Sequence, residues 1–151
     1  MKTRIGYAAG AFDLFHVGHL NLLAQARQRC DYLIAGVVSD ELLVATKGRA
    51  PVVPLAERLE IVRNIRYVDE AVAEVHESRL DTWRDTHFDI FFKGDDWRGT
   101  EKGISLEQQL STVGVEVVYF PYTMHTSSTV LRRALGRILE SEQGNAAANF
   151  A

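Results

Sequence analysis

Two histidines lie three residues apart in the stretch GAFDLFHVGHL, which spans residues 10–20. If a helix begins near His16, then His16 and His19 share one face of it, at the positive end of the helix dipole. Gly18 leaves the backbone between them accessible. Two imidazoles beside free N–H groups suit an anion, especially a phosphate that gains charge during a reaction. The pair could also bind a metal, although a nearby acidic or cysteine partner is lacking, or it could pack in the core.

The common phosphate-binding loops are absent, because the chain contains neither a P-loop nor a G-x-G-x-x-G pattern. The 151 residues carry a formal net charge of -3 with no basic run, which argues against a nucleic-acid-binding surface. A single cysteine, Cys30, excludes an internal disulfide and is compatible with a reducing compartment. No signal-peptide pattern and no apolar run of membrane-spanning length are found, so we expect a cytoplasmic protein without membrane contact.

Apolar runs and helical patterns alternate along the chain. The runs indicate buried strands at residues 4–10, 31–40, 70–75, 89–94 and 115–121. Helical spacing and capping residues indicate helices at residues 19–30, 40–46, 55–65, 80–86, 104–114 and 127–139. The segment Lys47–Val53 holds a glycine, a proline and two basic residues, which predicts a loop. Residues 1–140 are expected to form one domain, and the polar, alanine-rich residues 141–151 a frayed, disordered tail.

This alternation predicts an α/β fold of the doubly wound, Rossmann-like type: a five-stranded parallel sheet with helices on both faces. Ligands of such sheets bind beyond the carboxyl ends of the strands. The polar segments GAFDLFHVGH, SDELLVATKGR, GDDWRG and YTMHTSST follow the first, second, fourth and fifth predicted strands. We therefore expect these four segments to meet at one edge of the sheet.

Several blocks of the chain together resemble a known enzyme superfamily. GAFDLFHVGH resembles the H-x-G-H signature of the nucleotidylyltransferases, and RYVDE, GDDW and TSSTVL follow in the same order as in small cytidylyltransferases, most closely those acting on glycerol 3-phosphate. The resemblance, which spans residues 3–135, implies that a small polyol phosphate attacks the α-phosphorus of CTP in line. The products would be a CDP-alcohol and pyrophosphate, which leaves with its magnesium. Two alternatives are an ATP-dependent adenylyltransferase of the same superfamily and a nucleotide-binding module without catalysis.

The resemblance also implies roles for individual residues. His16 and His19 would contact the α-phosphate, and Lys47 would cover the phosphates from a mobile loop. Asp13 would tie its loop together through hydrogen bonds to the backbone, and Arg79 would meet the acceptor phosphate. The implied nucleotide-binding residues are Gly10, Ala11, Phe12, Gly18, Arg66, Asp96, Thr123, Ser127, Ser128 and Thr129. Magnesium would arrive with the nucleotide, no structural metal is expected, and the family suggests a homodimer.

Some of these roles have simpler alternatives. Lys47 could be a solvated loop lysine, Arg66 could brace Asp69, and the hydroxyls of residues 127–129 could simply cap the last helix. GDDW and RYVDE resemble cytidylyltransferases more than adenylyltransferases, so we expect CTP to be preferred over ATP. In that interpretation, backbone groups near Gly94 and in RYVDE form hydrogen bonds with cytosine.

The chain departs from the family's pattern at three positions. Ala11 stands where the family usually has threonine, which removes a hydroxyl from the nucleotide loop. Tyr122 stands where an arginine is frequent, and His125 where a glycine is usual. A protonated His125 would partly replace the lost positive charge. These departures bear on the acceptor and the nucleotide, and they leave the histidine pair and Lys47 in place.

Overall fold

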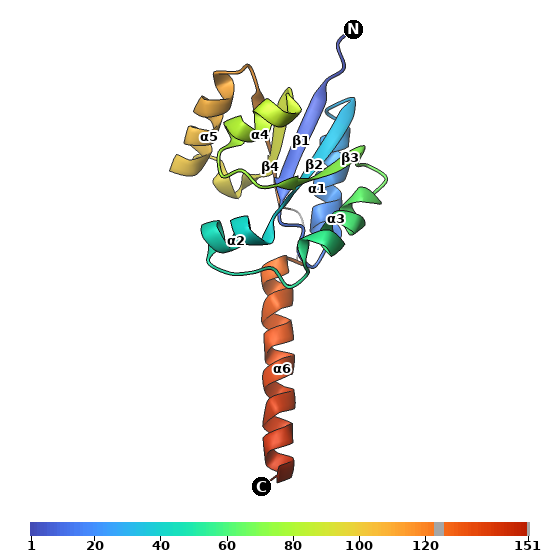
Figure 1. The fold of residues 1–151 in the computed structure, drawn as a ribbon, viewed down its shortest axis with the longest axis vertical. Helices are drawn as coiled ribbons and strands as arrows, with labels where there is room; N and C mark the ends of the chain where they lie inside the picture. Colours follow the sequence, from blue (N-terminus) through green and yellow to red (C-terminus); the bar gives the residue numbers. More distant parts are fainter. Residues whose placement is uncertain (123–125, 151) are drawn as a thin grey trace.

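Five parallel strands form one sheet in the computed structural model, which describes residues 1–122 and 126–150, without the side chains of 147–150 (Figure 1). The strands are β1 (Ile5–Gly10), β2 (Tyr32–Val38), β3 (Glu70–Glu74), β4 (Ile90–Gly94) and β5 (Glu116–Phe120). They lie in the order β3-β2-β1-β4-β5. The predicted doubly wound parallel sheet is therefore confirmed. Its strand order reverses between β1 and β4, where the loops that leave the two strands diverge and make room for a ligand.

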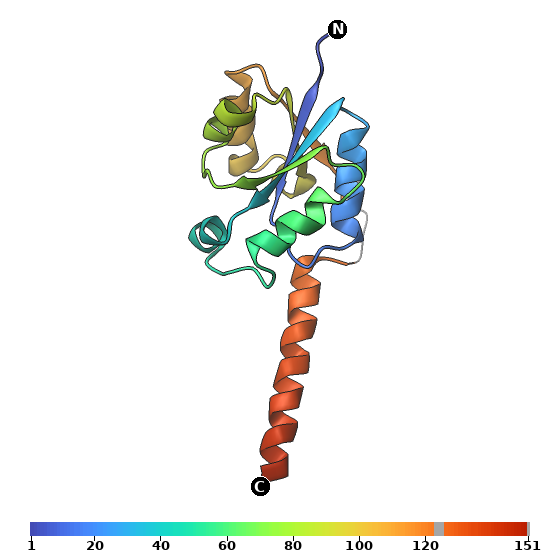
Figure 2. The ribbon, with the colours of Figure 1, turned by 45° about the vertical axis from the view of Figure 1, so that its right-hand side comes forward.

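Helices cover both faces of this sheet (Figures 1 and 2). They are α1 (Val17–Arg27), α2 (Asp40–Lys47), α3 (Leu55–Arg63), α4 (Arg79–Thr86), α5 (Glu101–Ser111) and α6 (Ser128–Phe150), with a 3₁₀ turn, η1, at Asp95–Trp97. Leu23 of α1 and Val62 of α3 pack on one face with Ala8, while Leu110 of α5 packs on the other with Tyr7. Successive side chains of a strand point to opposite faces, so neighbouring residues of β1 belong to different layers of the core.

A buried polar network joins the sheet to α4. The carboxylate of Glu74, which is 1% exposed, accepts hydrogen bonds from the Tyr7 hydroxyl at 2.6 Å and from Thr82 Oγ1 at 2.8 Å. The guanidinium of Arg79 lies 3.4 Å from the same carboxylate. Burial and the neighbouring Glu74 charge raise the pKa of Tyr7, so its hydroxyl remains a donor. Because a buried carboxylate is stable only when paired, this network fixes α4 at the end of β3.

The last helix is longer than the sequence predicted. α6 starts beside the carboxyl ends of the strands and projects away from the body of the protein as far as Phe150 (Figure 2). Residues 141–150 belong to this helix, while the domain end at residue 140 and the disordered tail expected from the sequence stay predictions. Its alanine, glutamate and glutamine residues favour helix without any tertiary partner. None of the helices in the described ranges is both long and apolar enough to cross a bilayer.

Candidate active site

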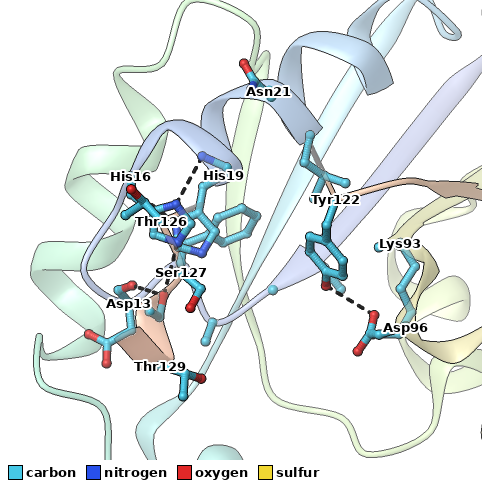
Figure 3. A pocket seen from close by; sticks show the side chains of 18 of the residues that line it. Asp13, His16, His19, Asn21, Lys93, Asp96, Tyr122, Thr126, Ser127 and Thr129 are labelled. Atoms are coloured by element: carbon cyan, nitrogen blue, oxygen red, sulfur yellow. Dashed lines mark hydrogen bonds between the residues drawn. The ribbon is translucent and has the colours of Figure 1, made fainter. Parts of the chain in front are cut away.

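A cavity of about 570 Å³ lies at the carboxyl edge of the sheet, and Figure 3 shows it from close by. Its walls come from the loops after β1, β4 and β5, the starts of α1 and α6, and the end of α2 with the loop that follows it. The cavity brings together these residues predicted from the sequence: Gly10, Ala11, Phe12, His16, Gly18, His19, Lys47, Asp96, Ser127, Ser128 and Thr129. Thr123, predicted to bind the nucleotide, and His125 lie outside the described residues. Convergence at this edge is what the order of elements predicted.

The two histidines are held by the first turn of α1. His16 is the N-cap, and its Nδ1 accepts a hydrogen bond from the Gly18 N–H at 3.0 Å. The His16 N–H in turn donates to Nδ1 of His19 at 3.3 Å, and the two ring centroids lie 4.0 Å apart. Because both Nδ1 atoms accept, the proton of each neutral ring is on Nε2. Each ring therefore offers an N–H donor away from its own backbone.

Burial keeps both imidazoles neutral. It lowers the pKa of His19 to about 4, with a smaller contribution from His16, and it lowers the pKa of His16 as well. The His19 ring also packs against the rings of Phe12 and Phe15, at centroid distances of 5.5 and 5.3 Å. Core packing thus accounts for one face of His19, and within residues 1–122 and 126–150 its Nε2 has no hydrogen-bond partner. Two neutral donors can approach one phosphate without repelling each other.

The glycine between the histidines has a steric role. A Cβ at Gly18 would lie 2.7 Å from Cε1 of His16, closer than any real contact of this kind. A side chain here would therefore displace the His16 ring from its N-cap position. Gly18, which was expected to leave the backbone accessible, also leaves room for the His16 ring.

Asp13 has the structural role that the sequence predicted. Its carboxylate is 2% exposed and accepts hydrogen bonds from the backbone N–H groups of Val52 at 2.8 Å and Val53 at 2.9 Å. It is flanked by Phe12 and Leu14, both in the left-handed backbone region with φ 51°. Such a conformation costs non-glycine residues of the order of ~1–2 kcal/mol. The anchored carboxylate helps to offset this cost and so fixes the loop that precedes the histidines.

Arg58 of α3 connects the loop after β1 with the segment before α3, and the sequence analysis did not single it out. The side chain is 1% exposed and donates at 2.7 Å to the carbonyls of Val53, Ala11 and Val38. It also forms an ion pair with Asp40 at 2.5 Å. The sequence pattern predicts only a helix over residues 55–65, and the burial of the arginine side chain reveals its role. Arg58 and Asp13 together clamp the segment that follows Lys47.

Three cations gather where α2 ends and α6 begins. Lys47 is the last residue of α2, and Gly48, with φ 72°, ends the helix. The expectation that Lys47 belongs to a loop is therefore wrong, because the glycine C-cap comes one residue later. Lys47, Arg49 and Arg132 all line the cavity, and burial together with the charges of the other two lowers the pKa of Lys47. Arg132 lies 3.7 Å from Asp13 Oδ2, one turn beyond the start of α6.

The hydroxyls at the start of α6 have partners within the protein. Ser127 Oγ accepts from the Val130 N–H at 3.1 Å, which confirms a helix cap. Ser128 Oγ donates to the Asp13 carbonyl at 2.7 Å and lies 3.4 Å from His16 Nε2. These contacts connect the start of α6 to the start of α1, so two helix N-termini border the same space.

Within the described residues, the cavity wall at the ends of β4 and β5 contains no histidine and is formed by aromatic and charged side chains. Lys93 places its Nζ 3.9 Å from the centre of the Trp97 ring, and burial lowers the pKa of this lysine to about 8. The Tyr122 hydroxyl donates to Asp96 Oδ1 at 3.1 Å. A Cβ at Gly94 would collide with this hydroxyl, so the contact requires a glycine. Sequence reasoning did not single out Lys93, nor Arg49, Arg132 and Asn21, which also line the cavity.

Arg66 is not among the residues that line the cavity, and its role in nucleotide binding stays a prediction. RYVDE precedes β3, and the start of a parallel strand lies at the opposite edge of the sheet from its end. The exposed Arg66 donates to the Tyr67 hydroxyl at 2.9 Å. It does not brace Asp69, which accepts from the Leu33 N–H at 2.7 Å and lies 3.6 Å from Arg27. Residues 66–70 do not line the cavity, and the expected hydrogen bonds of their backbone groups with cytosine stay a prediction.

Arg79, predicted to meet the acceptor phosphate, is not among the cavity's lining residues either. It donates to the His76 carbonyl at 3.0 Å and its charge faces the buried Glu74. Among the described residues, no group of three or more His, Cys, Asp and Glu side chains is placed to hold a metal ion.

A family model described as cytidylyltransferase-like matches residues 7–134. The chain belongs to the cytidylyltransferase-like family. The membership in the nucleotidyltransferase superfamily that the sequence predicted is confirmed. The cavity of this chain lies at the carboxyl edge of the sheet, where doubly wound proteins bind ligands.

Two relatives of this cytidylyltransferase-like chain carry different names. The glycerol-3-phosphate cytidylyltransferase of Bacillus subtilis is 37% identical over 136 residues, which cover 89% of this chain and 98% of the relative. The FAD synthase of Pyrococcus abyssi is 34% identical over 134 residues, which cover 87% of this chain and 89% of the relative. A solved structure, the lipopolysaccharide core biosynthesis protein of Thermoplasma volcanium, shares the fold with a TM-score of 0.69 at 22% identity, covering 83% of this chain and 100% of that one. The two relatives place the chain in the nucleotidyltransferase superfamily, and their names give two different substrates.

Proposed function

We propose that this protein transfers a cytidylyl group from CTP to the phosphate of a small phosphorylated alcohol, with glycerol 3-phosphate as the leading acceptor. One observation carries the proposal: two imidazoles whose Nδ1 atoms are taken up by backbone N–H groups line a cavity that three cations and two helix N-termini also border. That combination suits a triphosphate whose α-phosphorus is attacked. The relative from Bacillus subtilis, matched over nearly its whole length, supports the choice of acceptor.

The reaction would need no covalent enzyme intermediate. A phosphate oxygen of the acceptor forms a bond to the α-phosphorus, and the bond from the α-phosphorus to the oxygen bridging to the β-phosphorus breaks. Pyrophosphate leaves with that bridging oxygen and its electron pair. The attacking oxygen is already anionic near neutral pH, so no side chain has to remove a proton. Catalysis then consists of positioning and charge stabilisation.

Each group of the cavity has a role in this scheme. His16 and His19 donate from Nε2 to the α-phosphate oxygens, where charge builds in the transition state. Lys47, Arg49 and Arg132 neutralise the β- and γ-phosphates, together with the N–H groups at the start of α6. Neutral imidazoles suit the first task because they need no protonation in a buried site.

Magnesium enters this scheme as part of the substrate, bound to the phosphates of CTP. The described residues offer at most isolated carboxylates in the cavity, such as Asp96, so the nucleotide itself would supply most of the ligands. The homodimer and the cytoplasmic location expected from the sequence stay predictions.

A second candidate is transfer of an adenylyl group from ATP. The FAD synthase of Pyrococcus abyssi favours it, because this relative is nearly as similar over most of both chains and FAD contains an adenylyl group. A third candidate, nucleotide binding without catalysis, is less well supported because the histidine pair and Lys47 all line the cavity.

The test is a pyrophosphate-release assay with CTP and ATP, each combined with glycerol 3-phosphate or flavin mononucleotide in the presence of magnesium. We expect the largest kcat/KM for CTP with glycerol 3-phosphate. A larger value for ATP with either acceptor would reject cytidylyl transfer and leave the nucleotidyltransferase chemistry intact. Binding of CTP without any turnover would instead favour the non-catalytic module.

A further inference from the structure

The cations of the cavity fall into two groups. Lys47, Arg49 and Arg132 are close enough for the charges of both arginines to lower the pKa of the lysine. Lys93 belongs to β4 instead, and Figure 3 shows it on the wall opposite His16. The cavity therefore receives positive charge from β4 as well as from the end of α2 and the start of α6. A reaction that joins two separate phosphate compounds needs cations for each of them.

The charge of Lys93 is available to a ligand. Within the described ranges it makes no hydrogen bond and no ion pair, and its close partner is the face of Trp97, 3.9 Å from Nζ. A lysine over an aromatic face gains only about 0.5–2 kcal/mol. A phosphate can approach the remaining donors of the ammonium group without displacing the ring. Lys93 also stands on a central strand, which fixes its position.

Tyr122 explains why the nearest carboxylate does not pair with Lys93. Asp96 is close enough to act on the pKa of Lys93, yet its Oδ1 accepts a hydrogen bond from the Tyr122 hydroxyl at 3.1 Å. No ion pair between Asp96 and Lys93 is formed. The tyrosine that stands in place of the family's frequent arginine thus draws Asp96 toward β5 and leaves the ammonium group open to the cavity.

We propose that Lys93 binds the phosphate of the acceptor and that Tyr122 is a positioning residue that keeps Lys93 unpaired. This inference rests on the proposed function. In-line attack requires the acceptor phosphate to approach the α-phosphorus from the side opposite the leaving pyrophosphate. If the three-cation group holds the pyrophosphate portion, then the wall that carries Lys93 is the side from which the acceptor comes. The acceptor class is accordingly a phosphomonoester.

The physical setting of Lys93 suits a dianion. Burial lowers its pKa to about 8 because the surroundings solvate the ammonium poorly. A phosphate that replaces the lost solvation interacts with it more strongly than it would in water. In the free protein, the Lys93 ammonium group is poorly solvated, and an anion would stabilise it.

The test compares K93M with K102M. Lys102 is the matched control, since its Nζ also lies over the Trp97 ring, at 5.7 Å, but the residue does not line the cavity. With CTP and glycerol 3-phosphate as substrates, we expect K93M to raise the KM for glycerol 3-phosphate about 30-fold, roughly 2 kcal/mol, and the KM for CTP less than 3-fold. K93R should recover part of the loss, and K102M should leave both values unchanged. A larger effect of K93M on CTP than on the acceptor, or equal effects of K93M and K102M, would overturn the proposal.

A binding measurement separates this inference from the proposed function. Isothermal titration calorimetry with glycerol 3-phosphate, at saturation with a non-hydrolysable CTP analogue, requires no turnover. If K93M loses phosphate binding and K102M does not, the result supports the role of Lys93, whether or not any acceptor is turned over. Absence of turnover would reject the proposed function only. Undiminished binding to K93M would reject the role of Lys93 whatever the assay of turnover shows.

The role of Tyr122 has its own variant. Y122F removes the hydrogen bond to Asp96 and frees that carboxylate to compete for Lys93. We expect acceptor affinity to fall about 3- to 5-fold in Y122F and to recover in Y122F/D96N, where the competing charge is gone. A purely structural role of the tyrosine would give no such recovery, and absence of recovery contradicts the positioning role.

Discussion

The two walls of the cavity are built differently. One wall, here called the histidine wall, consists of the loop after β1 and the start of α1. There the Gly18 N–H fixes the His16 ring, and two backbone N–H groups fix the Asp13 carboxylate. The fully buried Arg58 holds the loops in place. On the opposite wall, Tyr122 is 71% exposed, and Lys93 rests on the Trp97 ring. Fixed donors stabilise a transition state because they need no reorganisation. We propose that the histidine wall serves the transfer reaction and that the opposite wall selects the acceptor.

The largest effect should come from removing the support of the histidine wall. R58M leaves Asp40 and three backbone carbonyls without their buried partner, so we expect a loss of about 3–5 kcal/mol in the free energy of unfolding. Urea denaturation measures it. The control is R63M on the same helix, because the exposed Arg63 has Glu60 as its single ion-pair partner in the described part of the chain, and its loss should cost less than about 1 kcal/mol. Equal stability of the two variants would contradict the supporting role of Arg58.

The next effect concerns the chemistry of the same wall. H16A and H19A should each lower kcat/KM at least about 100-fold, the typical result of losing a donor to a developing charge, with the fold intact by circular dichroism. H76A serves as the control, because His76 pairs with Asp85 outside the cavity. Near-normal turnover in both cavity variants, or a metal bound stoichiometrically between the two rings, would remove the assignment.

The burial of His19 predicts a pH dependence of stability. Its pKa in the folded protein, about 4, lies below the unfolded value of about 6.5. The unfolded chain thus binds more protons in this window, and stability falls as the pH drops from about 6.5 toward 4, with a slope of up to about 1.4 kcal/mol per pH unit. H19N should flatten the curve between these values. An unchanged slope in H19N would show that other groups cause the acid sensitivity.

The smallest expected effect concerns Lys47 and Arg49, which line the cavity next to the clamped segment. Magnesium and CTP should slow tryptic cleavage after these two residues several-fold, because bound phosphates engage both side chains. Cleavage after Arg63, outside the cavity, provides the internal reference. Equal rates with and without saturating nucleotide would argue against contact between this segment and the phosphates.

The order of elements and the histidine pair followed from the sequence alone. Apolar runs bounded by polar segments report burial locally, and the spacing of His16 and His19 fixes their geometry once a helix begins there. The same holds for the Ser127 cap, which needs only the residues of its own turn. The alanine-rich tail shows the limit of composition, since the residues that suggested fraying also form helix well.

The tertiary structure alone decided which segments face one another. Asp13 meets Val52 and Val53, which lie 39 and 40 positions further along the chain, and Tyr122 meets Asp96 across 26. RYVDE was predicted to contribute to the site, and the order of the elements places it at the opposite edge of the sheet. Spacing within a segment determines local geometry, but contacts between distant segments depend on strand order and register. Lys93 shows this most clearly, because its sequence neighbours indicate a strand, whereas its unpaired charge exists only where β4, η1 and β5 meet.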